Sequence, residues 1–314
     1  MAYQQPMRLV LTVAPPQTGD GGFSCPLGDG VYPTVQDAID AVPLRNTVRT
    51  TIVIPPGVYR QPLSLLLSLL LQPSRVIGTG TFGCGSTIVE GEDFIAENIT
   101  FENSAPQGSG QAVAVRVTAD RCAFYNCRFL GWQVRLSSSL DTLYLHHGKQ
   151  YLKDCYIEGS VDFIFGNSTS QGFITAQSRK SAQEPTGYIF LRCVITGNGS
   201  SAYASLGRPW GPFARVLYAY TWMDSCIKPA GWHNWDKPEN ERSACFFDLM
   251  GGIFLLFFLC RCSGPGSCQN ERVPWCRELD EEEAEQLLMH TFIDPDNENP
   301  WLAQRMSTKI PLSV

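Results

Sequence analysis

The residues best suited to chemistry in this sequence are two aspartates that lie within apolar segments. Asp162 occurs in Ser160-Val161-Asp162-Phe163-Ile164-Phe165-Gly166, where a carboxylate is costly to bury unless it is paired or hydrogen-bonded. Asp141 lies 21 residues earlier (162 − 141 = 21), a separation close to one short coil of a solenoid. Such coils stack about 4.8 Å apart, so the two carboxylates could face each other. Close carboxylates split their pKa values, which permits one acid and one nucleophile.

Arg208 is the candidate partner for one of these carboxylates. It lies in Leu206-Gly207-Arg208-Pro209-Trp210-Gly211, and a guanidinium can hold a carboxylate in its ionised form. The alternative is an Arg–Asp bridge with a purely structural role. Exposed aromatic rings on a solenoid groove commonly stack on sugar rings, although each ring could instead pack in the core. The tryptophans near Arg208 in the sequence are Trp210, Trp222, Trp232 and Trp235.

Other catalytic signatures are missing from the sequence. We find no G-x-S-x-G elbow of serine hydrolases, no G-x-x-x-x-G-K-[ST] phosphate loop and no H-E-x-x-H zinc motif. The cysteines at 260, 262, 268 and 276 have zinc-like spacing only once, so we predict no metal site. The net charge is −6 and no basic run occurs, which argues against nucleic acid as a partner.

Two apolar runs and the N-terminus bear on localisation. Residues 63–71 and 249–259 are apolar, but each run is shorter than the roughly 20 residues that a membrane-spanning helix needs. We therefore predict no membrane segment. The first eight residues do not fit a secretory signal, and the apolar stretch 9–13 is short and is followed by Pro15-Pro16.

Five short copies of one pattern organise the chain. Each alternates apolar and polar residues as a strand does, and turn residues follow. Their anchors at positions 98, 127, 155, 193 and 220 are spaced 29, 28, 38 and 27 apart. A strand repeat of this period predicts an all-β parallel β-helix with a Cys or Asn ladder inside, because stacked coils superimpose like residues. A single sheet with chance repeats is the competing fold. The acidic segment 278–290 predicts a surface helix.

Several segments resemble plant pectin methylesterases, the carbohydrate esterases of the cell wall. They run in the family's order over roughly residues 30–240, and together they are highly specific. The segments are Gly57-Val58-Tyr59, Gln111-Ala112-Val113-Ala114-Val115-Arg116, Asp141-Thr142-Leu143-Tyr144, residues 156–166, Leu206-Gly207-Arg208-Pro209-Trp210, and Met223-Asp224-Ser225 through Gly231-Trp232.

The resemblance implies a fold and a catalytic machinery. The fold is a right-handed parallel β-helix with a C-terminal helical and loop segment, and the reaction is hydrolysis of the methyl esters of polygalacturonate without a cofactor. Asp162 is then expected as the nucleophile, and Asp141 as the proton donor that later activates water. Arg208 would keep Asp162 charged, and Gln111 and Gln133 would donate hydrogen bonds to the oxyanion.

The resemblance also implies how substrate is bound and where the protein acts. Arg208, Trp210, Trp232 and Thr81 form the expected substrate-binding set, and methyl-esterified homogalacturonan is the expected partner. The family acts in the extracellular cell wall, although this chain shows no signal peptide. We expect a monomer.

The chain departs from the family pattern in several places. Seven residues, 134–140, separate Gln133 from Asp141, where the family has the two residues adjacent. A coil after the Phe-Gly-Asn segment is partly deleted, and residues 63–73 and 248–259 are foreign to the pattern. We accordingly divide the chain into an N-terminal extension (1–27), a β-helix domain (28–240) and a C-terminal segment (241–314).

Two alternatives to an esterase follow from these observations. A pectin-binding β-helix without full activity would result if the altered neighbourhood of Asp141 misplaces the acid. Another pectin-active solenoid, a polygalacturonase or lyase, would require clustered aspartates or calcium ligands that the sequence lacks.

Overall fold

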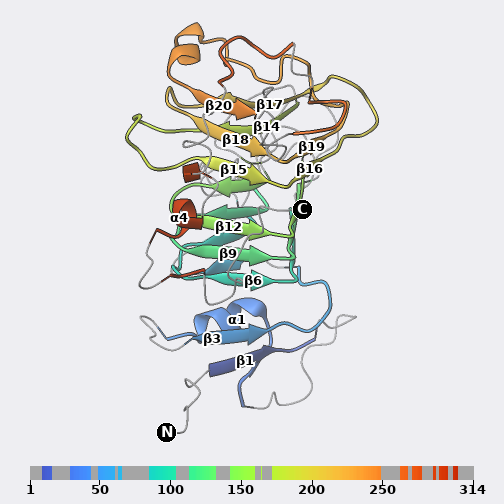
Figure 1. The fold of residues 1–314 in the computed structure, drawn as a ribbon. Coiled ribbons are helices and arrows are strands. Elements are labelled where there is room, and N and C mark those ends of the chain that lie inside the picture. The colour runs from blue at the N-terminus through green and yellow to red at the C-terminus, as the bar shows by residue number, and fades with distance from the viewer. Residues whose placement is uncertain are drawn as a thin grey trace, which may run out of the picture.

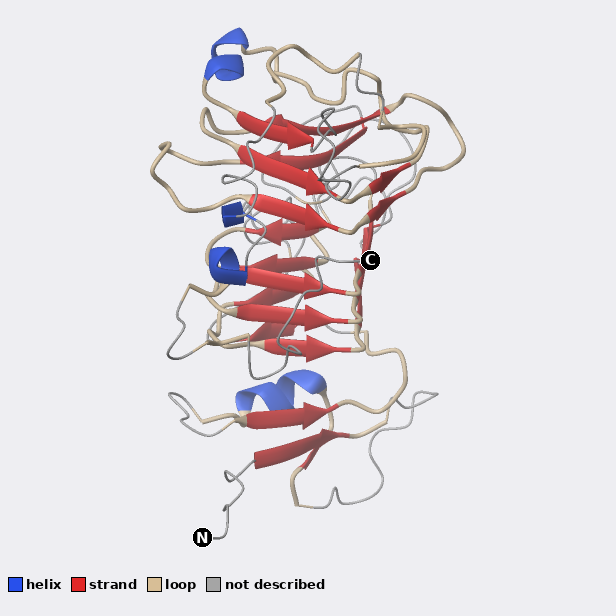
Figure 2. Ribbon diagram, viewed as in Figure 1, coloured by secondary structure: helices blue, strands red, loops and turns tan. Residues whose placement is uncertain are grey.

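The chain forms a stack of parallel β-coils (Figures 1 and 2). The computed structural model describes residues 9–15, 29–43, 49–60, 63–65, 85–103, 113–131, 142–159, 164, 172–248, 262–267, 271–277, 286–287, 290–295 and 300–302. Every strand pairing among these residues is parallel. The predicted parallel β-helix is therefore confirmed.

The N-terminal end is a small sheet covered by a helix. β1 (Leu9–Val13) lies between β2 (Val31–Tyr32) and β3 (Thr50–Val53), so part of the segment that we assigned to an N-terminal extension belongs to this sheet. α1 (Val35–Asp40) begins at Thr34, whose Oγ1 accepts a hydrogen bond from the Asp37 backbone N–H at 3.0 Å. Thr34 is thus the N-cap of α1, because threonine is one of the residues preferred at this position.

The next coils build three sheets. The first contains β4 (Leu63–Leu65), β5 (Thr87–Val89), β8 (Val115–Val117) and β11 (Leu143–Leu145). The second contains β6 (Ile95–Glu97), β9 (Cys122–Tyr125) and β12 (Gln150–Lys153). The third contains β7 (Thr100–Asn103), β10 (Arg128–Gly131) and β13 (Tyr156–Glu158).

The C-terminal coils repeat this arrangement. β14 (Gly172–Gln177) pairs with β17 (Ala204–Pro209), and β16 (Val194–Ile195) pairs with β19 (Trp222–Met223). β18 (Arg215–Ala219) lies between β15 (Tyr188–Leu191) and β20 (Cys245–Asp248), so coil structure continues past residue 240. The remaining elements are the 3-10 helix η2 (Pro238–Arg242) and α4 (His290–Ile293). Of the acidic helix expected over 278–290, residues 278–285, 288 and 289 lie outside the described residues.

Each copy of the sequence repeat is two strands joined at a corner rather than one strand. The corner residues have positive φ values of 50–59° and are Asn98, Asn126, Asp154, Arg192 and Tyr220. They are 28, 28, 38 and 28 residues apart. Asn and Asp tolerate this left-handed conformation better than most residues, and the corner asparagines stack, with Nδ2 of Asn126 donating to Oδ1 of Asn98 at 2.7 Å.

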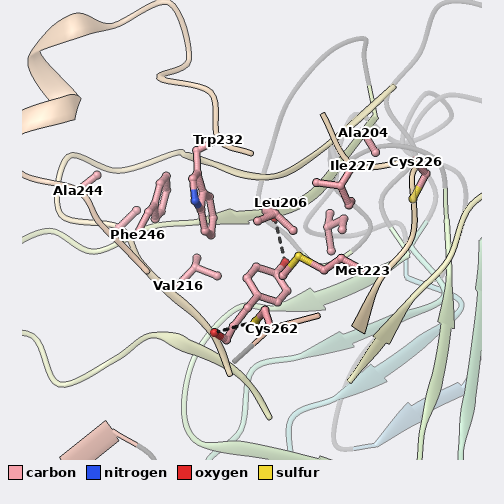
Figure 3. Packing of buried hydrophobic residues seen from close by; sticks show 13 residues of the cluster. Ala204, Leu206, Val216, Met223, Cys226, Ile227, Trp232, Ala244, Phe246 and Cys262 are labelled. Carbon is pink, nitrogen blue, oxygen red and sulfur yellow. Dashed lines mark hydrogen bonds between the residues drawn. The ribbon is translucent and has the colours of Figure 1, made fainter. Parts of the chain in front are cut away.

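The interior is filled by aromatic and aliphatic side chains. Phe101 and Phe129 stack with ring centroids 5.4 Å apart, on neighbouring coils. In the C-terminal coils, Tyr218 is fully buried and its hydroxyl donates to the Leu206 carbonyl at 3.0 Å (Figure 3). Cys127 is buried, in agreement with the expected interior ladder, and Cys155 is half-buried. The stacked Asn98 and Asn126 are exposed, so the expectation of asparagines inside the solenoid was wrong. No helix of the described part is long and apolar enough to cross a membrane.

Candidate active site

The structure describes three of the predicted site residues. These are Arg208, Trp210 and Trp232. The predicted nucleophile, acid, oxyanion donors and weaker substrate contact lie outside the described residues: Asp162, Asp141, Gln111, Gln133 and Thr81. The site is therefore built here from the strands on either side of the predicted carboxylates.

One row of paired residues connects the first sheet, through Ile164, to the strands β14 and β17. Leu143 pairs with Ile164, Ile164 with Thr175, Thr175 with Gly207, and Gly207 with Trp232, all in parallel register. The side chains of this row point into the solenoid, because those of Leu143, Thr175 and Trp232 are at most 2% exposed.

This row connects the chain segments that the sequence analysis linked to chemistry. Asp141 precedes Leu143 by two residues, and Asp162 precedes Ile164 by two residues. Arg208 follows Gly207 directly. Leu143 and Ile164, each two residues after a predicted carboxylate, thus lie in one row with Gly207, which precedes the predicted arginine; Thr175 of β14 lies between Ile164 and Gly207.

Arg208 lies on the outer side of β17, and its guanidinium lies over two aromatic rings. Its guanidinium carbon lies 4.0 Å from the ring centroid of Phe173 and 4.0 Å from that of Trp235. Only 5% of Arg208 is exposed. Trp235 also packs against Tyr144 and Ala176, which follow Leu143 and Thr175 in their strands. Aromatic side chains therefore lie around the buried guanidinium of Arg208.

The two predicted cleft tryptophans have different environments. Trp210 follows β17 and is 38% exposed, and its backbone N–H donates to the Gln177 carbonyl at 3.1 Å. Trp232 is 2% exposed and stacks on Phe246 with ring centroids 4.5 Å apart, inside the solenoid (Figure 3). Its Nε1 has no hydrogen-bond partner among the described residues. Trp232 therefore packs in the core, and this corrects the expectation that it lines the cleft.

Trp235 occupies the outer-face position that we had expected of Trp232. The two residues are three apart, and the row through Gly207 turns Trp232 inward. Both residues were among the aromatic rings that could stack on sugar, and the resemblance implied Trp232 for the cleft. The alternation of a strand does not apply here, because Trp235 and Asp236 have left-handed backbone conformations with φ values of 65° and 56°.

A second polar group lies on the same sheet, and sequence reasoning did not single it out. The Tyr144 hydroxyl and Nδ1 of His146 are 2.5 Å apart. Partial burial lowers the pKa of His146 from its ordinary value, with further lowering by Arg116 and His147. Arg116 pairs with Tyr144 in the sheet and forms an ion pair with Glu90 at 2.5 Å.

The arrangement can bind and stabilise negative charge. Arg116 of β8 and Arg208 of β17 are both buried cations, their strands are connected through the row Leu143–Ile164–Thr175, and two aromatic rings contact Arg208. A buried guanidinium is suited to a carboxylate, because it presents several donors in a fixed plane. Within the described ranges, no group of three His, Cys, Asp or Glu residues could hold a metal ion.

Comparisons with known proteins agree on one family. The chain matches the family model described as pectinesterase over residues 70–296. It is 62% identical to Pectinesterase 31 of Arabidopsis thaliana over 323 aligned positions, which cover 91% of this chain and 96% of that protein. Because the chain has only 314 residues, that alignment includes positions that the chain lacks.

Solved structures give the same result. The chain superposes on a pectin methylesterase from carrot with a TM-score of 0.72 and 26% identity, covering 93% of this chain and 94% of the carrot chain. It superposes on a pectin methylesterase from Aspergillus niger with a TM-score of 0.68 and 26% identity, covering 90% and 94%.

Proposed function

The chain belongs to the pectinesterase family, a family of carboxylic ester hydrolases that act on pectin, and we propose that Asp162 and Asp141 carry out its reaction with Arg208 as their charged partner. The observation that carries this proposal is the parallel row Leu143–Ile164–Thr175–Gly207. It joins the strands that follow both aspartates to the strand of the buried Arg208.

The proposed reaction has two steps. The Asp162 carboxylate attacks the methyl ester carbonyl of a galacturonate unit, and Asp141 gives a proton to the departing methanol. An anhydride between Asp162 and the substrate remains. Asp141, now ionised, takes a proton from water, and the resulting hydroxide attacks the anhydride and restores Asp162. The products are methanol and a free galacturonate carboxylate.

Arg208 has a defined part in this scheme. A nucleophilic carboxylate must stay ionised, and a nearby guanidinium favours its charged form. Arg208 is suited to this because it is buried and its guanidinium presents several donors in one plane. Gln111 and Gln133 are proposed to donate to the oxyanion of each tetrahedral intermediate, which is a large term in acyl transfer.

The finer features of the substrate complex are also proposals. Trp210 is exposed enough to stack on a sugar ring, and Thr81 is retained as a weaker contact. Methyl-esterified homogalacturonan is the proposed form of pectin, and the cell wall is the proposed site of action. A monomer suffices for this chemistry.

Methanol release tests the catalytic assignment. We expect release from highly methylated pectin by the wild type, and a loss of at least about 1,000-fold in Asp162→Asn, because a neutral amide cannot act as the nucleophile. Asp154→Asn is the matched control. Asp154 is exposed at a left-handed corner where asparagine fits equally well, so its activity should equal that of the wild type. Full activity in Asp162→Asn would refute the assignment of Asp162 as the nucleophile.

A pectin-binding protein without activity is the second candidate. Seven residues, 134–140, separate Gln133 from Asp141, and a displacement of about 1 Å can reduce a rate about 100-fold. A folded wild type that binds pectin but releases no methanol would support this reading. Chain cleavage of pectate would instead support a polygalacturonase or lyase.

A further inference from the structure

The plane of the Arg208 guanidinium is set by the two rings that contact it. Phe173 and Trp235 each lie with the ring centroid 4.0 Å from the guanidinium carbon, so both rings contact the same cation. Arginine stacks on aromatic faces, and its N–H donors then point outward through the edges of the plane. The direction in which Arg208 can donate to a carboxylate therefore depends on where the two rings are held.

Phe173 is fixed by the sheet, but Trp235 is not. Phe173 lies in β14, is 3% exposed and pairs with Ser205 of β17. Trp235 lies outside any strand, is half-buried, and has a φ of 65°. A left-handed conformation at a bulky residue is strained, and it persists only when surrounding contacts hold it.

His233 supplies those contacts for both rings. Nδ1 of His233 accepts a hydrogen bond from the Trp235 backbone N–H at 3.0 Å. The His233 ring packs edge-on against Phe173 with centroids 5.5 Å apart. The His233 backbone N–H donates to the Gly207 carbonyl at 3.1 Å, which ties it to the residue before Arg208.

We propose that His233 is a positioning residue for the esterase reaction. Its hydrogen bond to the Trp235 backbone holds the turn, and the position of Trp235 fixes the plane in which Arg208 donates. The inference rests on the proposed role of Arg208 beside the nucleophile. His233 acts through Arg208 and touches no reacting atom. Nothing in the sequence pattern alone distinguishes this histidine from the other three.

The hydrogen bond from the Trp235 backbone to His233 requires a neutral imidazole. Nδ1 can accept from Trp235 only when it carries no proton, which leaves the proton on Nε2, 3.9 Å from Oδ1 of the exposed Asp236. Partial burial lowers the pKa of His233, Asp236 opposes this, and Arg208 and Lys228 lower it further. When His233 is protonated, Nδ1–H of His233 and the Trp235 backbone N–H are both donors, so the hydrogen bond that holds the turn is lost. Positioning should therefore weaken as the pH falls through the pKa of His233.

Two substitutions at one position separate this role from a merely structural one. His233→Ala removes the acceptor. His233→Asn keeps it without a titrating group, because an asparagine Oδ1 readily accepts from the backbone N–H two residues later. We expect kcat on methylated pectin to fall about 10-fold in His233→Ala with little change in KM, and to stay within about threefold of the wild type in His233→Asn at neutral pH.

The pH profile is the decisive readout. In the wild type, the acid-side decline of kcat/KM should contain a contribution from His233, and in His233→Asn this contribution should be absent, so the decline starts at lower pH. Identical acid limbs in the two proteins, or a His233→Asn protein as impaired as His233→Ala, would overturn the proposal.

An NMR measurement, which does not depend on activity, separates the positioning role of His233 from the catalytic role of Arg208. The side-chain N–H resonance of Arg208 should show strong ring-current shifts in NMR spectra of the wild type and of His233→Asn, and lose them in His233→Ala. Unchanged shifts in a folded His233→Ala protein would refute the positioning role of His233, even if the wild type released no methanol. Conversely, full activity in Arg208→Gln would contradict the proposed catalytic role of Arg208. The ring-current shifts measured in the wild type would be unaffected by that result.

Discussion

Thr142 fills the space beside Gly131, where a side chain would otherwise lie. A Cβ on Gly131 would overlap Oγ1 of Thr142 and lie 3.0 Å from its Cβ. Thr142 is fully buried, and its hydroxyl donates to the Glu158 carbonyl at 3.1 Å. Because Thr142 directly follows Asp141 in the chain, this contact links the third sheet to the segment of the proposed acid.

Gly131→Ala should therefore destabilise the protein and lower its activity. We expect a loss of about 1–3 kcal/mol in the free energy of unfolding, because a packed interior cannot absorb the added methyl group. Denaturant unfolding measures it. Combining Gly131→Ala with Thr142→Ala, which removes the overlapping hydroxyl, should recover part of the loss relative to the sum of the single variants. Simple additivity of the two changes would contradict this account.

The hydrogen bond between Tyr144 and His146 should be visible in the titration of the histidine. The pKa of His146 is lowered from 6.5, so its ring should titrate below that value in an NMR pH series. A hydroxyl that donates to Nδ1 favours the neutral ring, so Tyr144→Phe should raise the midpoint of His146. It should also reduce stability by about 1 kcal/mol.

Tyr203→Phe is the control for that titration. The Tyr203 hydroxyl accepts from the Asn198 backbone N–H and has no recorded contact with His146. Its removal should leave the His146 midpoint where it was. A Tyr144→Phe protein with an unshifted midpoint would mean that the tyrosine hydroxyl does not donate to Nδ1 in solution.

Trp210 and Trp232 should respond differently to substitution. Trp210→Ala should raise KM for pectin about 10-fold, equivalent to 1.4 kcal/mol, because the ring is exposed where sugar could stack. Trp232→Phe should leave KM unchanged and cost about 1 kcal/mol of stability, because this ring packs on Phe246 inside the solenoid. Steady-state kinetics and thermal unfolding of both variants test the assignment. A raised KM in Trp232→Phe would contradict it.

Val216 and Val194 offer a matched pair for the core. Val216 is fully buried in β18, whereas Val194 is 69% exposed in β16. Val216→Ala should cost about 2 kcal/mol, because a buried valine loses its apolar contacts. Val194→Ala should change the free energy of unfolding by less than about 0.5 kcal/mol. Equal effects in chemical denaturation would show that the sheet around β18 is not packed as described.

The repeat period of the β-helix could be predicted from the sequence, but the left-handed corner at Arg192 could not. Stacked coils need the same length, so strand copies recur at a near-constant interval, and this predicted the parallel β-helix. The corner at Arg192 has no sequence signal, because arginine rarely adopts a positive φ. Only the stacking of one coil on the next enforces that conformation, and a single sequence does not display stacking energy.

The candidate site was partly predictable for a similar reason. Arg208 was identified from its motif, and the structure places it buried beside the expected strands. The roles of Phe173, Trp235 and His233 were not predicted, because Phe173 lies 35 residues from Arg208 and meets it only across paired strands (208 − 173 = 35). The inward position of Trp232 depended on a turn whose left-handed residues break strand alternation.

The corner spacing of 28, 28, 38 and 28 residues has a consequence for how such a chain can change length. A coil inserted or lost as a whole period keeps every later layer in phase. The interval from Asp154 to Arg192 is ten residues longer than the others (38 − 28 = 10), and within it the first sheet gains two rungs, at Ile164 and Thr175. This is a dislocation in the sense used for crystals: order is regular on both sides, and the mismatch is concentrated in one layer. In the sequence, the proposed nucleophile Asp162 falls within that longer interval.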